Sequence, residues 1–296
     1  MILGWVVSYL LIALLLGMAA MTAERLCRLR GWPGRWPWFA AMVGSVAVPE
    51  LPGLPAWKPV ARVVDQWVNS TSSAALALDA PLINLTFAAF LLALAVLILV
   101  TLRTSAARQT WRPVVVQGER CLIAPNAGPS AVGLFRGTIV LPEWALHLKR
   151  ESLRLILAHE REHLRGGDPR MLLAGLLILV LLPWNLPLWW QWRRLRRAIE
   201  LDCDARVLQQ TGALRPYTEL LLAVGGRQME LAGMAGLAAR SDLRHRLMAM
   251  TAPAPSRRQG GTLVLACNVL VLAGLALMLS GVMCAWCKPL SLVALS

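Results

Sequence analysis

The chain has 296 residues, of which 57% are hydrophobic, and its formal net charge is +14 at pH 7. A soluble domain of this length would need far more polar residues to cover its surface, so the composition argues against a wholly soluble protein. A strongly basic charge can indicate a nucleic-acid partner, but in a membrane protein it more often reflects cytoplasmic loops beside anionic lipid. We therefore expect a membrane protein with no nucleic-acid partner.

Apolar runs in the first third of the chain predict three membrane spans. Ile2–Met21 is long enough to cross a bilayer, and its arginines follow it, which indicates an uncleaved anchor with the N-terminus outside. Trp36–Val48 is a shorter run, and Pro81–Leu102 is a long one. The segment Glu50–Ala80 has few cations and several turn-forming residues, so it is predicted as an outside loop.

Charge and one more apolar run predict the topology of the rest of the chain. The arginine-rich stretch after Leu102 marks the inner side of the membrane, which agrees with the span count if Trp36–Val48 crosses. A last span at Thr262–Cys284 would put the C-terminus outside. The predicted domains are an N-terminal membrane region (1–102), a cytoplasmic domain (103–258) and a C-terminal span with a short tail (259–296).

The cytoplasmic domain is predicted to combine short strands with helices. The strands are rich in Val and Ile and are separated by Gly, Asn and Pro. They are expected at Val114–Gln117, Cys121–Ala124, Ala131–Phe135 and Thr138–Leu141. A helix is expected at Glu143–Arg165. The predicted fold is therefore a multi-span α-helical membrane protein with a small α+β domain between its third and last spans.

Two of the four histidines stand four residues apart, in the sequence His159-Glu160-Arg161-Glu162-His163. On a helix these two imidazoles share a face and can bind one metal ion. Zinc lowers the pKa of a bound water towards neutrality, and Glu160 could take the proton of that water as it attacks a peptide carbonyl. The alternative is an exposed, charged helix that matches the pattern by chance, and this alternative predicts nothing further along the chain.

A catalytic zinc site needs a third protein ligand and an open position for water. A third histidine shortly after the motif is ruled out, because Pro169 stands in its place. Glu200 and Asp204 are four residues apart, so Glu200 can be the third ligand while Asp204 hydrogen-bonds a liganding histidine; Asp202 is a weaker candidate. The alternative is that these acidic residues form a surface patch that balances the charge of the nearby arginines at 193–197.

The apolar run Met171–Trp192 bears on this ligand set. If it crossed the membrane once, His159 and Glu200 would lie on opposite sides and could not share a metal ion. Prolines at both ends of Pro183–Pro187 favour a bend, so we predict a hairpin that dips into the membrane, or lies along it, and returns to the inner side. The alternative is that Glu200 is not a ligand.

With these residues in hand, the chain resembles the membrane metallopeptidase family of the BlaR/MecR antibiotic-sensing transducers. The resemblance covers most of residues 80–250, and several pieces agree in order and spacing. They are Gly133–Pro142, His159–His163 with Arg165 and Asp168, Trp184–Pro187, Glu200–Asp204, Tyr217–Leu221 and Arg244–Met248.

The resemblance implies an integral protein of the bacterial inner membrane with a gluzincin domain that faces the cytoplasm. It implies one zinc ion, with His159, His163 and Glu200 as ligands and Glu160 as general base. In such peptidases an edge strand before the active-site helix pairs with the extended substrate. That strand is expected at Gly137, Thr138, Ile139, Val140 and Leu141, although these β-branched residues also suit an ordinary core strand.

Other residues receive weaker expectations. Tyr217 could stabilise the oxyanion of the tetrahedral intermediate or be buried in the core. Cys203, and the pair Cys284 and Cys287 in a CxxC spacing, are expected to be packing residues.

The antibiotic sensors of the family continue after the last span into a penicillin-binding domain, whereas this chain stops at Ser296. We therefore expect no direct β-lactam receptor role, and regulation through the Glu50–Ala80 loop, through a separate sensor protein, or not at all. The predicted function is a membrane zinc endopeptidase that cleaves a protein substrate in signal transduction or regulated proteolysis. The rival prediction is a catalytically silent signalling scaffold of the same fold.

Overall fold

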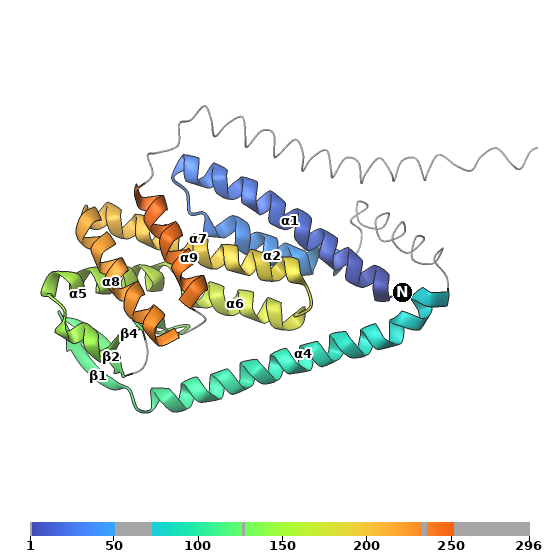
Figure 1. The fold of residues 1–296 in the computed structure, drawn as a ribbon, viewed down its shortest axis with the longest axis horizontal. Coiled ribbons are helices and arrows are strands. Elements are labelled where there is room, and N and C mark those ends of the chain that lie inside the picture. The colour runs from blue at the N-terminus through green and yellow to red at the C-terminus, as the bar shows by residue number, and fades with distance from the viewer. Residues whose placement is uncertain (1, 51–72, 126–127, 233–235, 252–296) are drawn as a thin grey trace, which may run out of the picture. The chain divides into compact units, whose positions relative to one another are not determined.

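The computed structural model describes residues 2–50, 73–125, 128–232 and 236–251 (Figure 1). The predicted last span and the CxxC pair lie outside the described residues, as does most of the predicted Glu50–Ala80 loop. The chain forms two compact units. Among the described residues, the first unit comprises residues up to Ala95 together with Gly175–Arg194, and the second comprises Val96–Ala174 and Leu195–Thr251.

Long helices form most of the first unit. Helix α1 is Ile2–Arg30, α2 is Arg35–Glu50, and α4 begins at Ser73 and runs to Arg108. Two stretches are long and apolar enough to cross a membrane, Trp5–Arg30 in α1 and Asp79–Arg108 in α4. Helix α2 has 16 residues and would be ~24 Å long, which is shorter than the ~30 Å hydrocarbon core. Its predicted crossing therefore stays a prediction.

Helix α4 exposes its apolar side chains all around. None of the apolar stretch that could span a membrane is buried within the protein. Its exposed side chains include Leu85, Phe87, Leu92 and Leu102. A helix that is apolar on every face is suited to lipid rather than to water. The prediction that the outside loop extends to Ala80 is wrong, because the helix already begins at Ser73.

The predicted hairpin is a pair of helices with a break between them. Helix α6 (Asp168–Leu181) ends before the prolines, and α7 (Leu186–Thr211) begins after a turn in which the chain reverses direction (Figure 1). In the first unit, the buried Asn185 side chain donates to the Tyr9 carbonyl and Gln191 donates to that of Ala13. The chain thus leaves the second unit after Ala174 and returns to it at Leu195.

A four-stranded sheet lies in the second unit. Its strands are β1 (Arg112–Val116), β2 (Glu119–Ala124), β3 (Ser130–Val132) and β4 (Thr138–Pro142), in the spatial order β1-β2-β4-β3. Strands β2 and β4 are parallel, and the other neighbouring pairs are antiparallel. The β1–β2 turn has positive φ at Gln117 and Gly118, as a two-residue type I′ hairpin requires.

The strand order corrects the predicted substrate strand. Residues Thr138–Leu141 pair with β2 on one side and with β3 on the other, so β4 is internal and buried from Ile139 on. The expectation of an edge strand at Gly137–Leu141 is therefore wrong, and the edge beside β4 is β3. The predicted strand Ala131–Phe135 is also shorter in the structure and ends at Val132.

The predicted helix Glu143–Arg165 is in fact two helices. Glu143–His147 forms a 3₁₀ turn, Leu148 and Lys149 are extended, and α5 runs from Arg150 to Gly166. Helices α8 (Leu214–Ala232) and α9 (Gly236–Thr251) complete the described part of the second unit. Side chains from β2, β4, α5, α7 and α8 form its hydrophobic core.

Candidate functional site

Helix α5 is held against the sheet by its apolar face. Leu153, Ile156 and Leu157 are buried in the core, and each lies three or four residues from another apolar residue of that face. His159 follows this apolar face by two residues, and His163 stands one turn later. Helix α5 is therefore anchored in the core by its apolar face and places both imidazoles in a pocket of the second unit.

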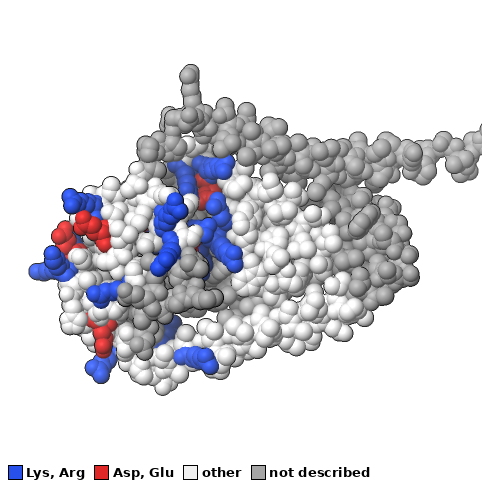
Figure 2. Space-filling model, in the orientation of Figure 1, with Lys and Arg blue, Asp and Glu red and all other residues white. Residues whose placement is uncertain are grey.

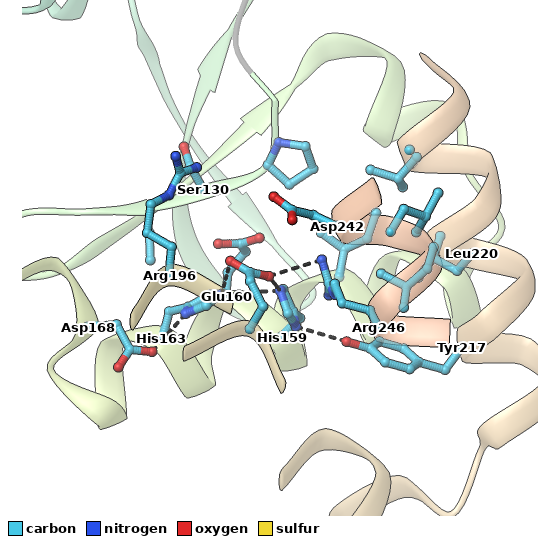
Figure 3. Close-up of a pocket in the computed structure, with 18 of the residues that line it drawn as sticks. Ser130, His159, Glu160, His163, Asp168, Arg196, Tyr217, Leu220, Asp242 and Arg246 are labelled. Carbon is cyan, nitrogen blue, oxygen red and sulfur yellow. Dashed lines mark hydrogen bonds and ion pairs between the residues drawn. The ribbon is translucent and has the colours of Figure 1, made fainter. Parts of the chain in front are cut away.

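The end of α5 brings Asp168 back to the second histidine. Gly167 has a φ of 68°, in the left-handed region that favours glycine, and its N–H donates to the carbonyls of His163 and Leu164. The chain turns sharply at this cap, and α6 begins with Asp168. The buried Asp168 carboxylate lies 2.8 Å from Nδ1 of His163 (Figure 3).

The two histidines and Glu200 converge on one point. The Nε2 atoms of His159 and His163 are 3.2 Å apart. The Glu200 carboxylate oxygens lie 3.6 Å from Nε2 of His159 and 3.8 Å from Nε2 of His163. Ligands at ~2.0–2.2 Å from a tetrahedral zinc ion are roughly 3.3–3.6 Å from one another. Two imidazole nitrogens and a carboxylate at these distances fit a zinc ion.

Cys203 lies close to the same histidines. Its buried sulfur is 3.4 Å from Nδ1 of His159 and 3.3 Å from the His159 carbonyl. His159, His163 and Cys203 are therefore a second group that could hold a metal ion. However, the sulfur is close to Nδ1 of His159, whereas Glu200 approaches the two facing Nε2 atoms. Cys203 is also part of the hydrophobic core, as its predicted packing role requires.

A chain of side chains connects His159 to an arginine on α9. The Tyr217 hydroxyl lies 2.8 Å from Nδ1 of His159 and donates to the Asp204 carboxylate at 2.7 Å. Arg246 donates to both oxygens of Asp204, at 2.6 and 2.8 Å, and forms a 3.0 Å ion pair with Glu200. Asp204 itself is 3.6 Å from His159, so it reaches this histidine through Tyr217 rather than directly.

Glu160 lies in the pocket beside the histidines and is 5% exposed. Burial raises the pKa of its carboxyl above the usual value, and the two histidines and Arg246 only partly offset this effect. A general base works best when its pKa lies near the working pH. The environment of Glu160 therefore shifts its pKa in the direction that a general base needs.

Both histidines retain protons strongly in the metal-free chain. Burial alone would lower the pKa of His159, but Cys203, Glu200 and Glu160 outweigh it and raise the pKa to about 10. For His163, burial is outweighed mainly by the hydrogen bond to Asp168, and the pKa rises to about 11. The pKa of Glu200 is lowered, because His159 and Arg246 outweigh its burial. The group is thus arranged to hold positive charge.

The pocket has walls of different chemistry (Figure 3). Ser130 and Ala131 of the edge strand β3 line one part, together with Arg196 of α7. Another part is apolar and is formed by helices α8 and α9. Its apolar side chains are Leu220, Leu221, Val224 and Leu243. His159, His163 and Glu200 therefore lie in an open pocket between a strand edge and an apolar wall.

The structure brings most of the predicted site residues together. His159, Glu160, His163, Glu200 and Tyr217 all line this pocket, and Asp204 lies behind it. Residues Gly137–Leu141 do not line it. Two residues with clear contacts, Asp168 and Arg246, received no role from the sequence, although both stand in segments that carry the resemblance.

A helix with HExxH spacing and an acidic residue from a later helix is the arrangement with which one class of metallopeptidases binds zinc. Residues 123–250 match the family model of the BlaR1 peptidase M56, and this stretch contains the whole described site. The resemblance to the BlaR/MecR peptidases is thereby confirmed. No curated protein and no solved structure matches the chain. The family and the two apolar helices together indicate a membrane protein of the metallopeptidase type.

Proposed function

We propose that this chain is an integral membrane zinc endopeptidase that hydrolyses a peptide bond in a cytoplasmic or membrane-proximal protein, in signal transduction or regulated proteolysis. The observation that carries the proposal is the convergence of His159, His163 and Glu200 beside the buried Glu160 in an open pocket. Its partners would be the bilayer, a protein substrate and, where the activity is regulated, a separate sensor protein.

His159 and His163 would hold the zinc ion through Nε2, and Glu200 would hold it through its carboxylate. When bound, zinc would polarise the substrate carbonyl and acidify a water molecule at its open position. Glu160 would accept the proton of the attacking water and deliver it to the leaving amine. Its burial favours both steps, because the raised pKa lets the protonated form persist between them.

Substrate binding is best assigned to β3. This strand is the sheet edge next to β4, and its residues Ser130 and Ala131 line the pocket. An extended peptide that adds to β3 would gain main-chain hydrogen bonds and pass the histidines. An apolar side chain next to the cleaved bond could then enter the wall formed by Leu220 and Leu243.

Tyr217 is better suited to a positioning role than to the predicted oxyanion role. Its hydroxyl contacts Nδ1 of His159 and donates its proton to Asp204. A donor that is already engaged on the far side of the imidazole has no proton left for an oxyanion beside the metal.

Zinc content and proteolysis of the detergent-purified full chain test the proposal. The variants are Glu160→Gln, Glu200→Ala and Cys203→Ser, with the exposed Glu151→Gln on the same helix as the control. We expect about one zinc per chain in all of them except Glu200→Ala, which should lose most of it. Cleavage of a complex peptide mixture should fall by ~100-fold or more in Glu160→Gln and remain in Cys203→Ser and Glu151→Gln.

Other results would overturn particular parts of the proposal. Zinc that is retained in Glu200→Ala but lost in Cys203→Ser would assign the third ligand to the cysteine. Absence of zinc from the wild-type chain, or equal proteolysis by wild type and Glu160→Gln, would reject the peptidase and favour a silent signalling scaffold.

A further inference from the structure

Arg196 lies on the same face of α7 as the predicted zinc ligand. It precedes Glu200 by four residues, and Asp204 follows Glu200 by four, so the three side chains form one stripe along the helix. Arg196 is exposed and lines the pocket that contains His159 and Glu160. One helical turn, or ~5.4 Å of rise, separates Arg196 from Glu200 along the helix.

Apart from Glu160, the other carboxylates and the arginine Arg246 that line the pocket have partners of opposite charge. Asp242 is paired with Arg197 at 2.7 Å. Glu200 is paired with Arg246, and Asp168 with His163. By contrast, no ion pair or hydrogen bond of Arg196 is found within the described ranges of the chain. Its guanidinium is a charge that the pocket itself leaves without a counterion.

The position of Arg196 relative to the strand edge suggests what it binds. Arg196 and Ser130 of β3 line the same pocket, and in Figure 3 both labelled side chains stand on the side of the histidines away from Leu220 and Tyr217. A peptide on the outer edge of β3 would therefore carry some of its side chains past this guanidinium. Arginine binds carboxylates through two parallel N–H donors, which makes it selective for acidic side chains.

We propose that Arg196 forms a subsite for an acidic substrate side chain, Asp or Glu, close to the cleaved bond. This inference rests on the proposed peptidase function and names the substrate class of the same site. The substrate would then have a carboxylate that binds Arg196 on one side of the bond and an apolar residue that faces the α8–α9 wall on the other. The preference for an acidic side chain would come from the positive charge of Arg196, which is on the same helix as Glu200.

The test uses the full chain in detergent and starts from a peptide that the wild-type enzyme cleaves in a complex mixture. This peptide is synthesised with a C-terminal amide in two versions, which have Glu or Gln at one position near the cleaved bond. The Glu side chain is then the carboxylate whose effect on cleavage is measured. The variants are Arg196→Glu and, as the control, Arg154→Glu, which changes an exposed arginine on α5 that does not line the pocket. Zinc content checks that each variant retains its site.

We expect the wild type and Arg154→Glu to cleave the Glu peptide with a kcat/KM ~10-fold higher than that for the Gln peptide at the best position. Arg196→Glu should lose this preference and favour a Lys peptide. Binding of the same peptides to the Glu160→Gln variant, followed by fluorescence anisotropy, should show the same order of affinities without turnover.

Equal kcat/KM for Glu and Gln peptides at every position, or a Glu preference that survives in Arg196→Glu with full zinc, would overturn the subsite while the peptidase function stands. If wild type and Glu160→Gln are equally unable to cleave any peptide, the proposed function fails, and this inference fails with it.

Discussion

His163 and His159 each have a partner at Nδ1 that orients the ring. Asp168 accepts from Nδ1 of His163, and the Tyr217 hydroxyl is placed to accept from Nδ1 of His159 while it donates to Asp204. A proton on Nδ1 leaves the lone pair on Nε2, so these contacts select the tautomer that can bind metal. Arg246 neutralises the buried Asp204, and Arg206 lies 4.0 Å from the buried Asp168.

Removal of either orienting partner should weaken zinc binding without removing a ligand. We expect Tyr217→Phe and Asp168→Asn each to lower the affinity for zinc by ~10- to 100-fold, as is typical for such partners. A competitive chelator titration of the purified chain measures this change. Thr218→Val, at the residue next to Tyr217, serves as the control, because among the described residues its hydroxyl donates to the Arg215 carbonyl of its own helix and to no other group. Unchanged affinities in both variants would show that the packing of α5 alone orients the imidazoles.

Zinc binding should release protons, because the pKa values of His159 and His163 in the metal-free chain are about 10 and 11. The two facing Nε2 atoms are 3.2 Å apart and cannot both carry a proton, so at pH 7.5 the pair holds one extra proton that must leave before both imidazoles can be ligands. We expect the release of about one proton per zinc, and an affinity that rises with pH. Calorimetric titration in buffers of different ionisation enthalpy measures the number. Zinc binding without proton release would mean that the carboxylates do not hold the imidazole pair in the charged form.

The raised pKa values of His159 and His163 also determine how the stability of the metal-free chain changes with pH. A folded-state pKa above the unfolded value of ~6.5 contributes stability that is fully present below pH ~6.5 and is lost as the pH rises towards the folded value. The metal-free chain should therefore become less stable as the pH rises above neutrality. Bound zinc should reverse this trend, because it takes the place of the protons.

At the scale of elements, a buried carboxylate connects α5 to α7. Glu162 is 3% exposed and accepts hydrogen bonds from Arg165 at 2.8 Å, Arg206 at 2.9 Å and Gln210 at 2.9 Å. Burial alone would raise its pKa, but these three donors outweigh burial and lower it. Glu162 thus holds the helix of the two histidines against the helix of Glu200.

A lowered folded-state pKa means that Glu162 stabilises the fold above its unfolded pKa, and that this stability is lost as the pH falls through the folded value. Glu162→Gln should therefore destabilise the zinc-bound chain at pH 7 by about 2 kcal/mol; this is less than for a fully buried pair, since Arg206 is partly exposed. The difference between variant and wild type should shrink in acid. Thermal unfolding in detergent at several pH values measures it. A difference that stays the same from pH 7 to a pH well below 4.5 would contradict the ionic contribution.

A close approach between β4 and α5 makes Gly137 sensitive to substitution. A Cβ at this position would collide with the Leu164 side chain, which is next to His163. Gly137→Ala should cost about 1–3 kcal/mol, because Leu164 would have to move in a packed region. The matched control is Gly226→Ala in α8, where a Cβ would meet nothing within 4 Å. Equal thermal stability of the two variants would show that Leu164 can rotate away freely.

The sequence predicted the features that depend on local residue spacing. It did not predict those that depend on contacts between strands or helices far apart in the sequence. The HExxH spacing and the Glu200–Asp204 spacing are helical periodicities, so His159, His163 and Glu200 could be grouped from the sequence alone. The internal position of β4 could not be predicted from the sequence. It depends on the pairing of β3 with the outer edge of β4, and β3 is only three residues long. Arg246 was missed because nothing local to α9 reveals the two carboxylates that it neutralises on α7.

At the scale of the whole molecule, the exposed apolar surface of α4 has the clearest consequence. Lipid is the solvent in which that surface is stable, and the family match points the same way. In Figure 2 the part of α4 in view is mostly uncharged. We expect the chain to stay with the membrane fraction after alkaline carbonate or high salt and to need detergent for release. A control peripheral protein should be released by the same wash, and recovery of the chain in that wash would reject the spans in α1 and α4.

The side of the membrane that the candidate site faces depends on whether the short helix α2 crosses the bilayer. If α2 crosses, the α1–α2 turn at Gly31–Gly34 and the turn after α4 at Gln109–Thr110 lie on the same side of the membrane. If α2 does not cross, they lie on opposite sides. The arginines at the end of α1 and after α4 predict that both turns face the cytoplasm. An epitope inserted at either turn of the full chain should then be detectable only after the cells are permeabilised. Detection of the Gln109–Thr110 epitope on intact spheroplasts, with the Gly31–Gly34 epitope still protected, would show that α2 does not cross and would place the candidate site outside.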